Sequence, residues 1–277
     1  MLVVSLSTIP PRFDKIGETL KSLLNQSVKA DHIYLYIPET YRRFPDWDGQ
    51  LPDVPDGITI KRTDVDLGPA TKILPAARAH RDMDCDIVFC DDDRLYRRNW
   101  LADFVKTRKT QPKAAIANLG FLAEEILPSS GKDRPQPSVE RTWRIIDLDF
   151  QLRFLGRQIR AGWNWRKVHG PWRRVYKKSG FIDIFEGCGG VMVRADSFPD
   201  AAYDIPPVLW TVDDVWLSGM LRLNKVGIWL RGNQFPPKET DARLVEALVT
   251  SVVDGSDRKN ANLKAAEYFQ QNHGIWL

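Results

Sequence analysis

The sequence predicts an α/β protein with a mostly parallel central sheet flanked by helices. Short apolar runs suit buried strands, and the segments between them space their apolar residues as helices do. Strand-helix-strand order at the N-terminus implies a right-handed crossover and therefore parallel pairing. With 277 residues, 43% of them hydrophobic, the chain can bury one sizeable core. We expect a single domain, 1–277.

The first half supplies most of the expected elements. Residues 2–6 and 33–37 predict buried strands, and residues 16–24 predict the helix between them. A third strand is expected at 58–62. No glycine-rich phosphate loop follows the first strand, so a hydride-transfer enzyme or a P-loop ATPase is not expected.

The stretch 85–94 is the most informative in the chain. Residues 87–90 predict a strand buried on both faces, and Asp91, Asp92 and Asp93 follow it directly. Ligands of open α/β sheets bind beyond the carboxyl ends of the strands. Adjacent carboxylates repel one another unless a cation neutralises them, and hard oxygen ligands suit Mg²⁺ or Mn²⁺. We expect a divalent metal carrying a phosphate; the alternative is a solvated turn, which aspartate also favours.

Residues 64–75 precede this strand. Gly68 and Pro69 predict a turn, and a helix is expected from Ala70 onward with its N-terminal end at the ligand edge of the sheet. Lys72 would lie in the first turn of that helix, where it could reach a diphosphate or be an ordinary surface lysine. A helix around 100–105 and a strand at 114–117 follow the aspartates.

The C-terminal half carries two further candidate site segments, one rich in glycine and one acidic. Residues 187–190 carry glycines before an expected strand, which permits close approach to a ligand or forms a β-bulge. Asp213 and Asp214 begin an expected helix, where aspartate either caps the helix or acts as a general base. A last strand is expected at 226–230.

The order of these features resembles GT-A fold glycosyltransferases, especially the inverting, family-2-like branch. The features are the Thr-Ile-Pro-Pro-Arg turn at 8–12, the Asp-Leu-Gly-Pro-Ala-Thr-Lys segment at 66–72 and the Asp-Asp-Asp strand end. The resemblance covers residue 1 to about 115 and resumes near Phe185. It implies a nucleoside-diphosphate sugar donor, a UDP-sugar being favoured, and Mn²⁺ or Mg²⁺ on Asp91 and Asp93, with Asp92 near the ribose or metal.

The resemblance also assigns roles outside the aspartate cluster. Thr8, Arg12 and Lys72 would face the nucleotide. Matching Asp213-Asp214-Val-Trp-Leu to the family's Glu-Asp-x-x-Leu pattern puts the general base on Asp214. The first position is Asp where the family has Glu, so the choice between Asp213 and Asp214 stays open. The remaining assignments are Gly189, Gly190 and Trp210 to the acceptor and His273, alternatively a surface or core histidine, to the metal.

Residues 119–180 look like an insertion between a nucleotide-sugar-binding half, 1–118, and an acceptor-binding half, 181–277. Arginines and lysines alternate there with tryptophans, a combination that suits an anionic membrane surface, a lipid-linked acceptor or an acidic glycan. Single-strand nucleic-acid binders share it, although nucleic acid is the less favoured partner, and a solvated helix with inward tryptophans is the plain alternative. The tryptophans are Trp143, Trp163, Trp165 and Trp172.

Composition bounds the location. Three cysteines without metal-ligand spacing fit a reducing compartment, and no apolar run approaches the roughly 20 residues of a membrane span. We expect a cytoplasmic protein, free or peripheral at the inner face of the membrane. The predicted function is metal-dependent, inverting sugar transfer to a glycan or lipid-linked acceptor in surface polysaccharide synthesis. An Asp-dependent phosphohydrolase and a non-catalytic glycan- or nucleic-acid-binding module remain alternatives.

Overall fold

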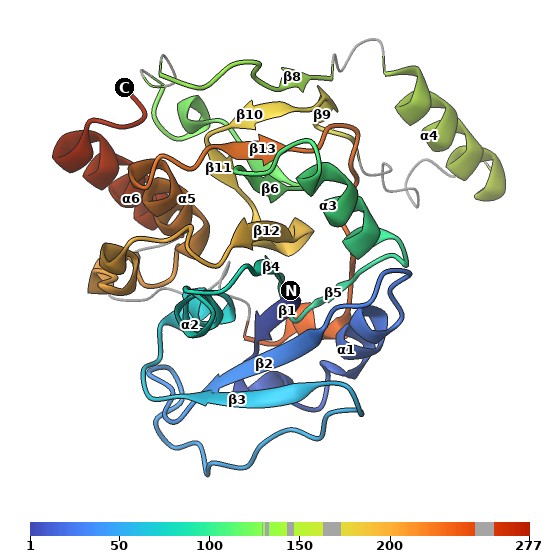
Figure 1. Ribbon diagram of the computed structural model, residues 1–277. Helices are drawn as coiled ribbons and strands as arrows, with labels where there is room; N and C mark the ends of the chain where they lie inside the picture. The colour runs from blue at the N-terminus through green and yellow to red at the C-terminus, as the bar shows by residue number, and fades with distance from the viewer. Residues whose placement is uncertain (129, 131–132, 143–146, 163–172, 247–257) are drawn as a thin grey trace.

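The computed structural model describes residues 1–277 except 129, 131–132, 143–146, 163–172 and 247–257. Its largest sheet has eight strands (Figure 1). In spatial order they are β10 (Gly180–Ile182), β13 (Ile228–Leu230), β6 (Ala115–Ala117), β12 (Val191–Arg194), β4 (Asp86–Phe89), β1 (Leu2–Ser7), β2 (His32–Pro38) and β3 (Thr59–Thr63).

The sheet is mostly parallel, as the sequence predicted. β3, β2, β1 and β4 run in one direction, and β6 and β13 pair in parallel with each other. β12 lies antiparallel between β4 and β6, and β10 is antiparallel to β13 at the edge. Because β12 is reversed, its amino end lies at the same edge of the sheet as the carboxyl ends of β1 to β4.

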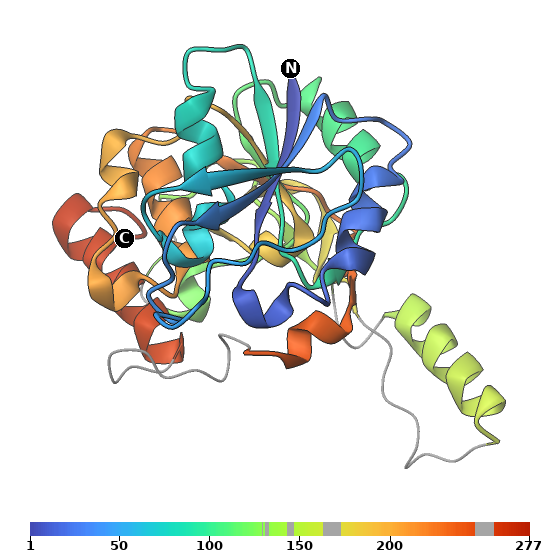
Figure 2. The same cartoon turned by 90° about the horizontal axis from the view of Figure 1, so that it is seen from below.

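Helices cover both faces of the sheet. α1 (Gly17–Leu24) and α3 (Trp100–Arg108) lie on one face, and α2 (Leu74–Ala79), α5 (Asp213–Leu223) and α6 (Arg258–His273) lie on the other (Figures 1 and 2). Successive strand residues point to opposite faces, so Ile87 and Phe89 join the core under α5 while Val88 joins the core under α1 and α3. This double burial explains why the strand sequences are apolar throughout.

Three short ribbons complete the strands of the described residues. β5 (Arg94–Leu95) pairs with β14 (Lys238–Glu239), β7 (Gly120–Phe121) with β11 (Ile184–Phe185), and β8 (Glu140–Arg141) with β9 (Tyr176–Lys178). The β5–β14 ribbon brings the segment after β14 back to the end of β4, where the Thr240 N–H donates to the Asp93 carbonyl at 2.9 Å. One further helix, α4 (Leu148–Arg160), projects from the body (Figure 2).

The expected helix from Ala70 onward is corrected in one respect. Gly68–Lys72 forms a 3-10 helix, and α2 begins only at Leu74. Pro75 is the physical reason, because proline has no N–H to donate and is tolerated in the first turn of an α-helix but not deeper. Lys72 therefore ends the 3-10 helix instead of lying in the first turn of an α-helix.

In the part of the chain that the structure describes, no helix combines the length and apolar character that crossing a membrane requires.

Gly190, just before β12, offers a test of packing at the centre of the sheet. Its φ is +86°, and an added Cβ would collide with the Trp100 indole. Gly49 has a similar φ of +83° but open space around it. Gly49→Ala should lower the free energy of unfolding by about 1 kcal/mol, and Gly190→Ala by roughly 1–3 kcal/mol more, because overpacking adds to backbone strain. Urea denaturation measures both; equal losses would show that the indole moves aside without cost.

Candidate functional site

A cavity of about 390 Å³ lies at the edge of the sheet where the carboxyl ends of its parallel strands meet. The loops after β1, β2, β3 and β4 all contribute to its wall, as do the loop before β12 and the start of α5. This is the edge at which open α/β sheets bind ligands. The cavity brings together Thr8, Arg12, Lys72, Asp91, Asp92, Asp93, Trp210, Asp213 and Asp214, all of which the sequence singled out.

Asp92 connects the ends of β1 and β4. Its carboxylate accepts a hydrogen bond from Thr8 Oγ1 at 2.5 Å and from Arg12 Nη1 at 2.6 Å, and its carbonyl accepts from Thr19 Oγ1 at 2.8 Å. Burial raises the pKa of Asp92, and the Arg12 guanidinium opposes that rise. With both carboxylate oxygens engaged, Asp92 holds the wall of the cavity together.

Asp93 ionises less readily than an ordinary aspartate. Burial raises its pKa to about 6, and the neighbouring Asp91 and Asp92 add to the rise. Arg94 Nε lies 3.2 Å from Asp93 Oδ1, and Arg12 Nη1 lies 3.7 Å from the other oxygen. Oδ1 is buried without a hydrogen bond in the described chain. A cation bound here would relieve the crowding of negative charge.

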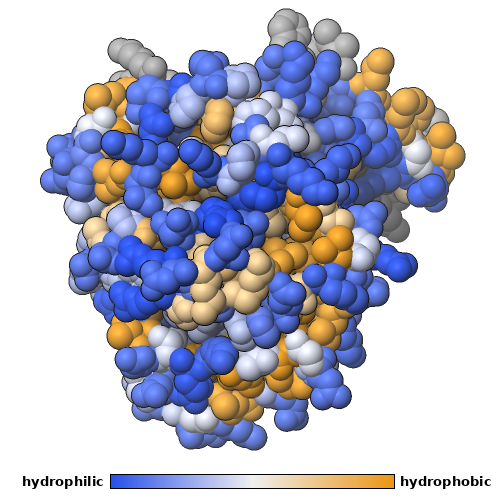
Figure 3. All heavy atoms as spheres, viewed as in Figure 1, coloured by the Kyte–Doolittle hydropathy of each residue, from blue (hydrophilic) through white to orange (hydrophobic). Residues whose placement is uncertain are grey.

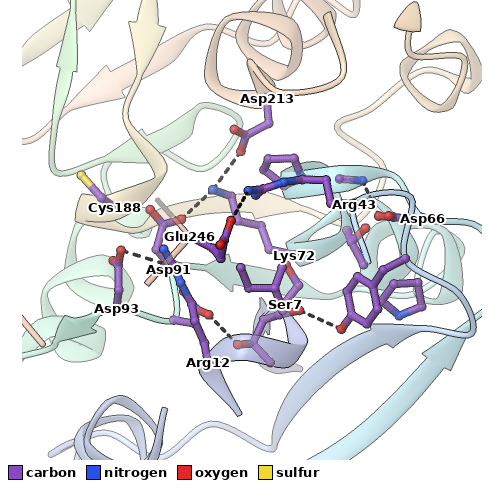
Figure 4. A pocket seen from close by; sticks show the side chains of 18 of the residues that line it. Ser7, Arg12, Arg43, Asp66, Lys72, Asp91, Asp93, Cys188, Asp213 and Glu246 are labelled. Carbon is purple, nitrogen blue, oxygen red and sulfur yellow. Dashed lines mark hydrogen bonds and ion pairs between the residues drawn. The ribbon is translucent and has the colours of Figure 1, made fainter. Parts of the chain in front are cut away.

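Lys72 links the aspartate cluster to the start of α5. Its Nζ donates to Asp91 Oδ1 at 2.6 Å and lies 2.8 Å from Asp213 Oδ2, and its side chain is only 7% exposed (Figure 4). Burial alone would lower the Lys72 pKa, but Asp213, Asp91 and Asp214 together raise it well above its ordinary value. The side chain therefore stays an ammonium, buried between two carboxylates.

The glycine loop before β12 makes room for this ion pair. A Cβ on Gly187 would lie 2.6 Å from Lys72 Nζ, so any larger residue would displace the ammonium from its present position. The Gly187 N–H donates to Asp214 Oδ1 at 2.9 Å, which orients that carboxylate in the cavity wall. Asp213 is 4% exposed, whereas Asp214 is half-buried.

Three other predicted site residues do not line the cavity. Gly189 and Gly190 lie behind it, where the Gly189 carbonyl accepts hydrogen bonds from the Trp100 indole and the Asn118 amide. His273 is exposed at the end of α6, and its ring contacts Tyr268 and Phe269. Trp143, Trp163, Trp165, Trp172 and part of the basic run lie outside the described residues.

Sequence reasoning missed several lining residues. Tyr41 and Arg43 follow β2, and Asp66 follows β3, so their position just after a parallel strand was a usable signal. Arg243 and Glu246 come from the segment after β14, and no local sequence pattern predicted that they would line the cavity. Glu246 Oε2 accepts from Arg43 Nη2 at 3.2 Å, which joins that distant segment to the loop after β2 (Figure 4).

The side chains that could act as metal ligands in this cavity fit a divalent cation only in part. Among the described residues, no group of three or more His, Cys, Asp and Glu side chains is placed to hold a metal. Asp91 and Asp93 nevertheless offer hard oxygen ligands, and Asp93 Oδ1 accepts no hydrogen bond in the described chain although Arg94 Nε lies 3.2 Å from it. Mg²⁺ is commonly held by one or two carboxylates, with water and substrate phosphates completing its shell. These two carboxylates are compatible with that mode.

Comparisons with solved structures give only distant likenesses. Residues 1–349 of S. aureus TarS share 11% identity, with 98% of this chain and 72% of that chain covered and a TM-score of 0.44. A mycobacterial protein shares 11%, covering 99% and 75% at a TM-score of 0.46. UDP-glucose pyrophosphorylase complexed with UDP-glucose shares 10%, covering 98% of each chain at 0.41. At such scores they do not assign a function. No family model and no curated protein matches the sequence.

The buried ion pair predicts energetic coupling. Lys72→Met leaves Asp91 and Asp213 without their counter-ion and should lower the free energy of unfolding by about 3–5 kcal/mol. Asp213→Asn should also destabilise. The loss of unfolding free energy in the double variant should be smaller than the sum of the two single losses, by roughly 0.5–3 kcal/mol.

Chemical denaturation of the four proteins measures this coupling. Lys178, which pairs with Glu140 at 2.8 Å and is 63% exposed, is the matched control. Lys178→Met should cost less than about 1 kcal/mol because solvent screens the pair. Strict additivity of Lys72→Met and Asp213→Asn would contradict the coupling.

Proposed function

We propose that the protein transfers a sugar from a nucleoside-diphosphate sugar to a hydroxyl of a glycan or lipid-linked acceptor. One observation carries the proposal: the aspartates at the end of β4 face the acidic pair at the start of α5 across a single cavity. Such a site can hold a leaving diphosphate at one end and take a proton from a nucleophile at the other.

The donor end is lined with cationic and aromatic side chains. Arg12, Arg43 and Arg243 line the cavity, and guanidinium groups bind phosphate oxygens in a bidentate manner. Tyr41 and Phe44 offer ring surfaces beside them for a base or ribose. The cavity volume of about 390 Å³ is within the ordinary range for small-ligand sites. UDP-sugars are the donors we favour.

Asp91 and Asp93 would hold Mn²⁺ or Mg²⁺, which when bound would neutralise charge on the departing diphosphate. This assignment draws on Asp93 Oδ1, which accepts no hydrogen bond among the described residues, and on the burial and carboxylate repulsion that raise the Asp93 pKa. The metal would compete with Lys72 for Asp91, since Lys72 already lies 2.6 Å from Asp91 Oδ1.

Asp214 is the proposed general base. It is half-buried in the cavity wall, and the Gly187 N–H fixes one of its oxygens. Asp213 is engaged with the Lys72 ammonium and is nearly inaccessible, so we assign it to positioning of α5. A base that deprotonates the acceptor hydroxyl for direct attack on the anomeric carbon leads to inversion of configuration.

Asp214→Asn tests the base. The amide cannot accept the acceptor proton, so transfer should fall by at least about a hundredfold while donor binding stays within about twofold of the wild type. Radiolabelled sugar transfer and donor titration measure the two properties. Asp200→Asn, at an exposed aspartate paired with Arg81, is the control and should be fully active. Normal turnover by Asp214→Asn would remove this residue from the mechanism.

Donor and metal are tested by calorimetric titration of UDP-, GDP- and CMP-sugars with Mn²⁺ and then with EDTA. We expect one nucleotide to bind with Mn²⁺, and binding to weaken by tenfold or more in Asp91→Ala/Asp93→Ala, because two metal ligands are lost. Unaltered binding by that variant would exclude the metal site. Binding without turnover would favour a non-catalytic module, and phosphate release from the donor without transfer would favour a phosphohydrolase.

A further inference from the structure

α4 carries an exposed apolar face. Leu148, Leu152, Leu155 and Ile159 are spaced by four, three and four residues, which places them on one side of the helix. Their exposed fractions are 70%, 68%, 43% and 58%. Hydrophobic atoms accordingly gather over α4 at the upper right of Figure 3. A helix of this length presents the stripe over about 20 Å.

The other side of α4 faces the body and is cationic. The Arg173 guanidinium lies 3.6 Å from the centre of the Phe150 ring, and Arg153 and Arg174 lie 4.5 and 4.4 Å from the centre of the Phe235 ring. These contacts fix which side of the helix is turned inward. The apolar stripe is left facing away from the domain.

The charged side chains of α4 lie on the side opposite the stripe and are mostly positive. α4 contains Arg153, Arg157 and Arg160 against one acidic residue, Asp149, which Arg153 already pairs at 2.8 Å. Lys177 in β9 is also exposed in the same inserted segment. An amphipathic helix with one apolar face and arginines on its polar face is suited to the boundary between anionic headgroups and acyl chains.

The placement of α4 relative to the cavity agrees with this. In Figure 2, β1 runs from the N-terminus toward the lower part of the picture. The carboxyl end of β1 therefore points downward, and α4 projects from that lower side of the molecule. The candidate site lies at the same carboxyl ends. α4 itself therefore projects on the side of the molecule where the cavity is found.

We propose that the α4 face formed by Leu148, Leu152, Leu155 and Ile159 docks onto an anionic membrane surface. An anionic membrane is the occupant we favour because the polar face of α4 is cationic, and a second copy of the chain is the other outcome that the test below distinguishes. The docking surface stands independently of the donor chemistry. That the acceptor is lipid-linked, held near the cavity by this docking, rests on the proposed function.

Flotation with vesicles tests the proposal, in the absence of any donor. The wild type should float with vesicles of equal parts phosphatidylglycerol and phosphatidylcholine, and much less with phosphatidylcholine alone. Leu152→Glu/Ile159→Glu should weaken binding by more than about tenfold, because each buried aliphatic side chain contributes strongly. Arg157→Gln/Arg160→Gln should weaken it by roughly fivefold for each arginine and reduce its salt dependence.

Leu51→Glu/Met83→Glu is the matched control, since it adds the same charge at exposed apolar positions on the body and should float as the wild type does. Circular dichroism and nucleotide titration of each variant establish that the fold and cavity are intact, so failure of docking and failure of the proposed function are distinguishable. Absence of wild-type flotation, or equal flotation by Leu152→Glu/Ile159→Glu, would overturn the proposal. A wild-type dimer that this variant dissociates, without vesicle binding, would assign the stripe to self-association and overturn it too.

Discussion

The buried ammonium of Lys72 is the interaction on which the candidate site depends. It is held 2.6 Å from Asp91 and 2.8 Å from Asp213, so it joins the end of β4 to the first residue of α5. Removing two carboxylates and an ammonium from water is costly, and only their close mutual contact offsets that cost. The two acidic pairs can therefore approach each other across one cavity because a cation lies between them.

The surrounding backbone is shaped to admit that contact. Gly187 has no side chain where Lys72 must pass, and its N–H orients Asp214. The reversed direction of β12 brings this glycine loop to the same edge as the aspartates. Thr8 and Arg12, from the end of β1, fix Asp92 from the opposite side. The cavity wall is thus assembled from strand ends that are far apart in sequence but adjacent in the sheet.

The helix α4 adds a second kind of surface. The cavity is rich in paired charges, whereas the outer face of α4 is apolar and lacks a covering element among the described residues. The arginines of α4 and the arginines lining the cavity are both suited to phosphates, although the former lie on a helix with an apolar opposite face and the latter border carboxylates. In the proposed function the cavity binds the nucleotide-sugar donor, and the outer face of α4 holds the protein at a membrane that carries the acceptor.

Much of the fold followed from local pattern, because strands buried on both faces must be apolar and strand ends must be polar. Leu2–Ser7, His32–Pro38 and Asp86–Phe89 lie where the apolar runs predicted strands, and the aspartate cluster lies at a carboxyl end as expected. The helix expected from Ala70 onward begins only at Leu74, because Pro75 is tolerated in the first turn of an α-helix and not in a later one. Arg243 and Glu246 were missed because their approach depends on β5–β14 pairing, which no short motif encodes.

The sequence by itself determined the α/β class, the parallel strands and the position of both acidic pairs, since these depend on composition and periodicity along the chain. Only the tertiary structure decided that Lys72 lies between Asp91 and Asp213, that Asp213 is buried in the cavity wall while Asp214 is half-buried, and that His273 does not line the cavity. The physical reason is that ion pairing and burial depend on which strand ends become neighbours. The order of strands in the sheet decides which strand ends become neighbours.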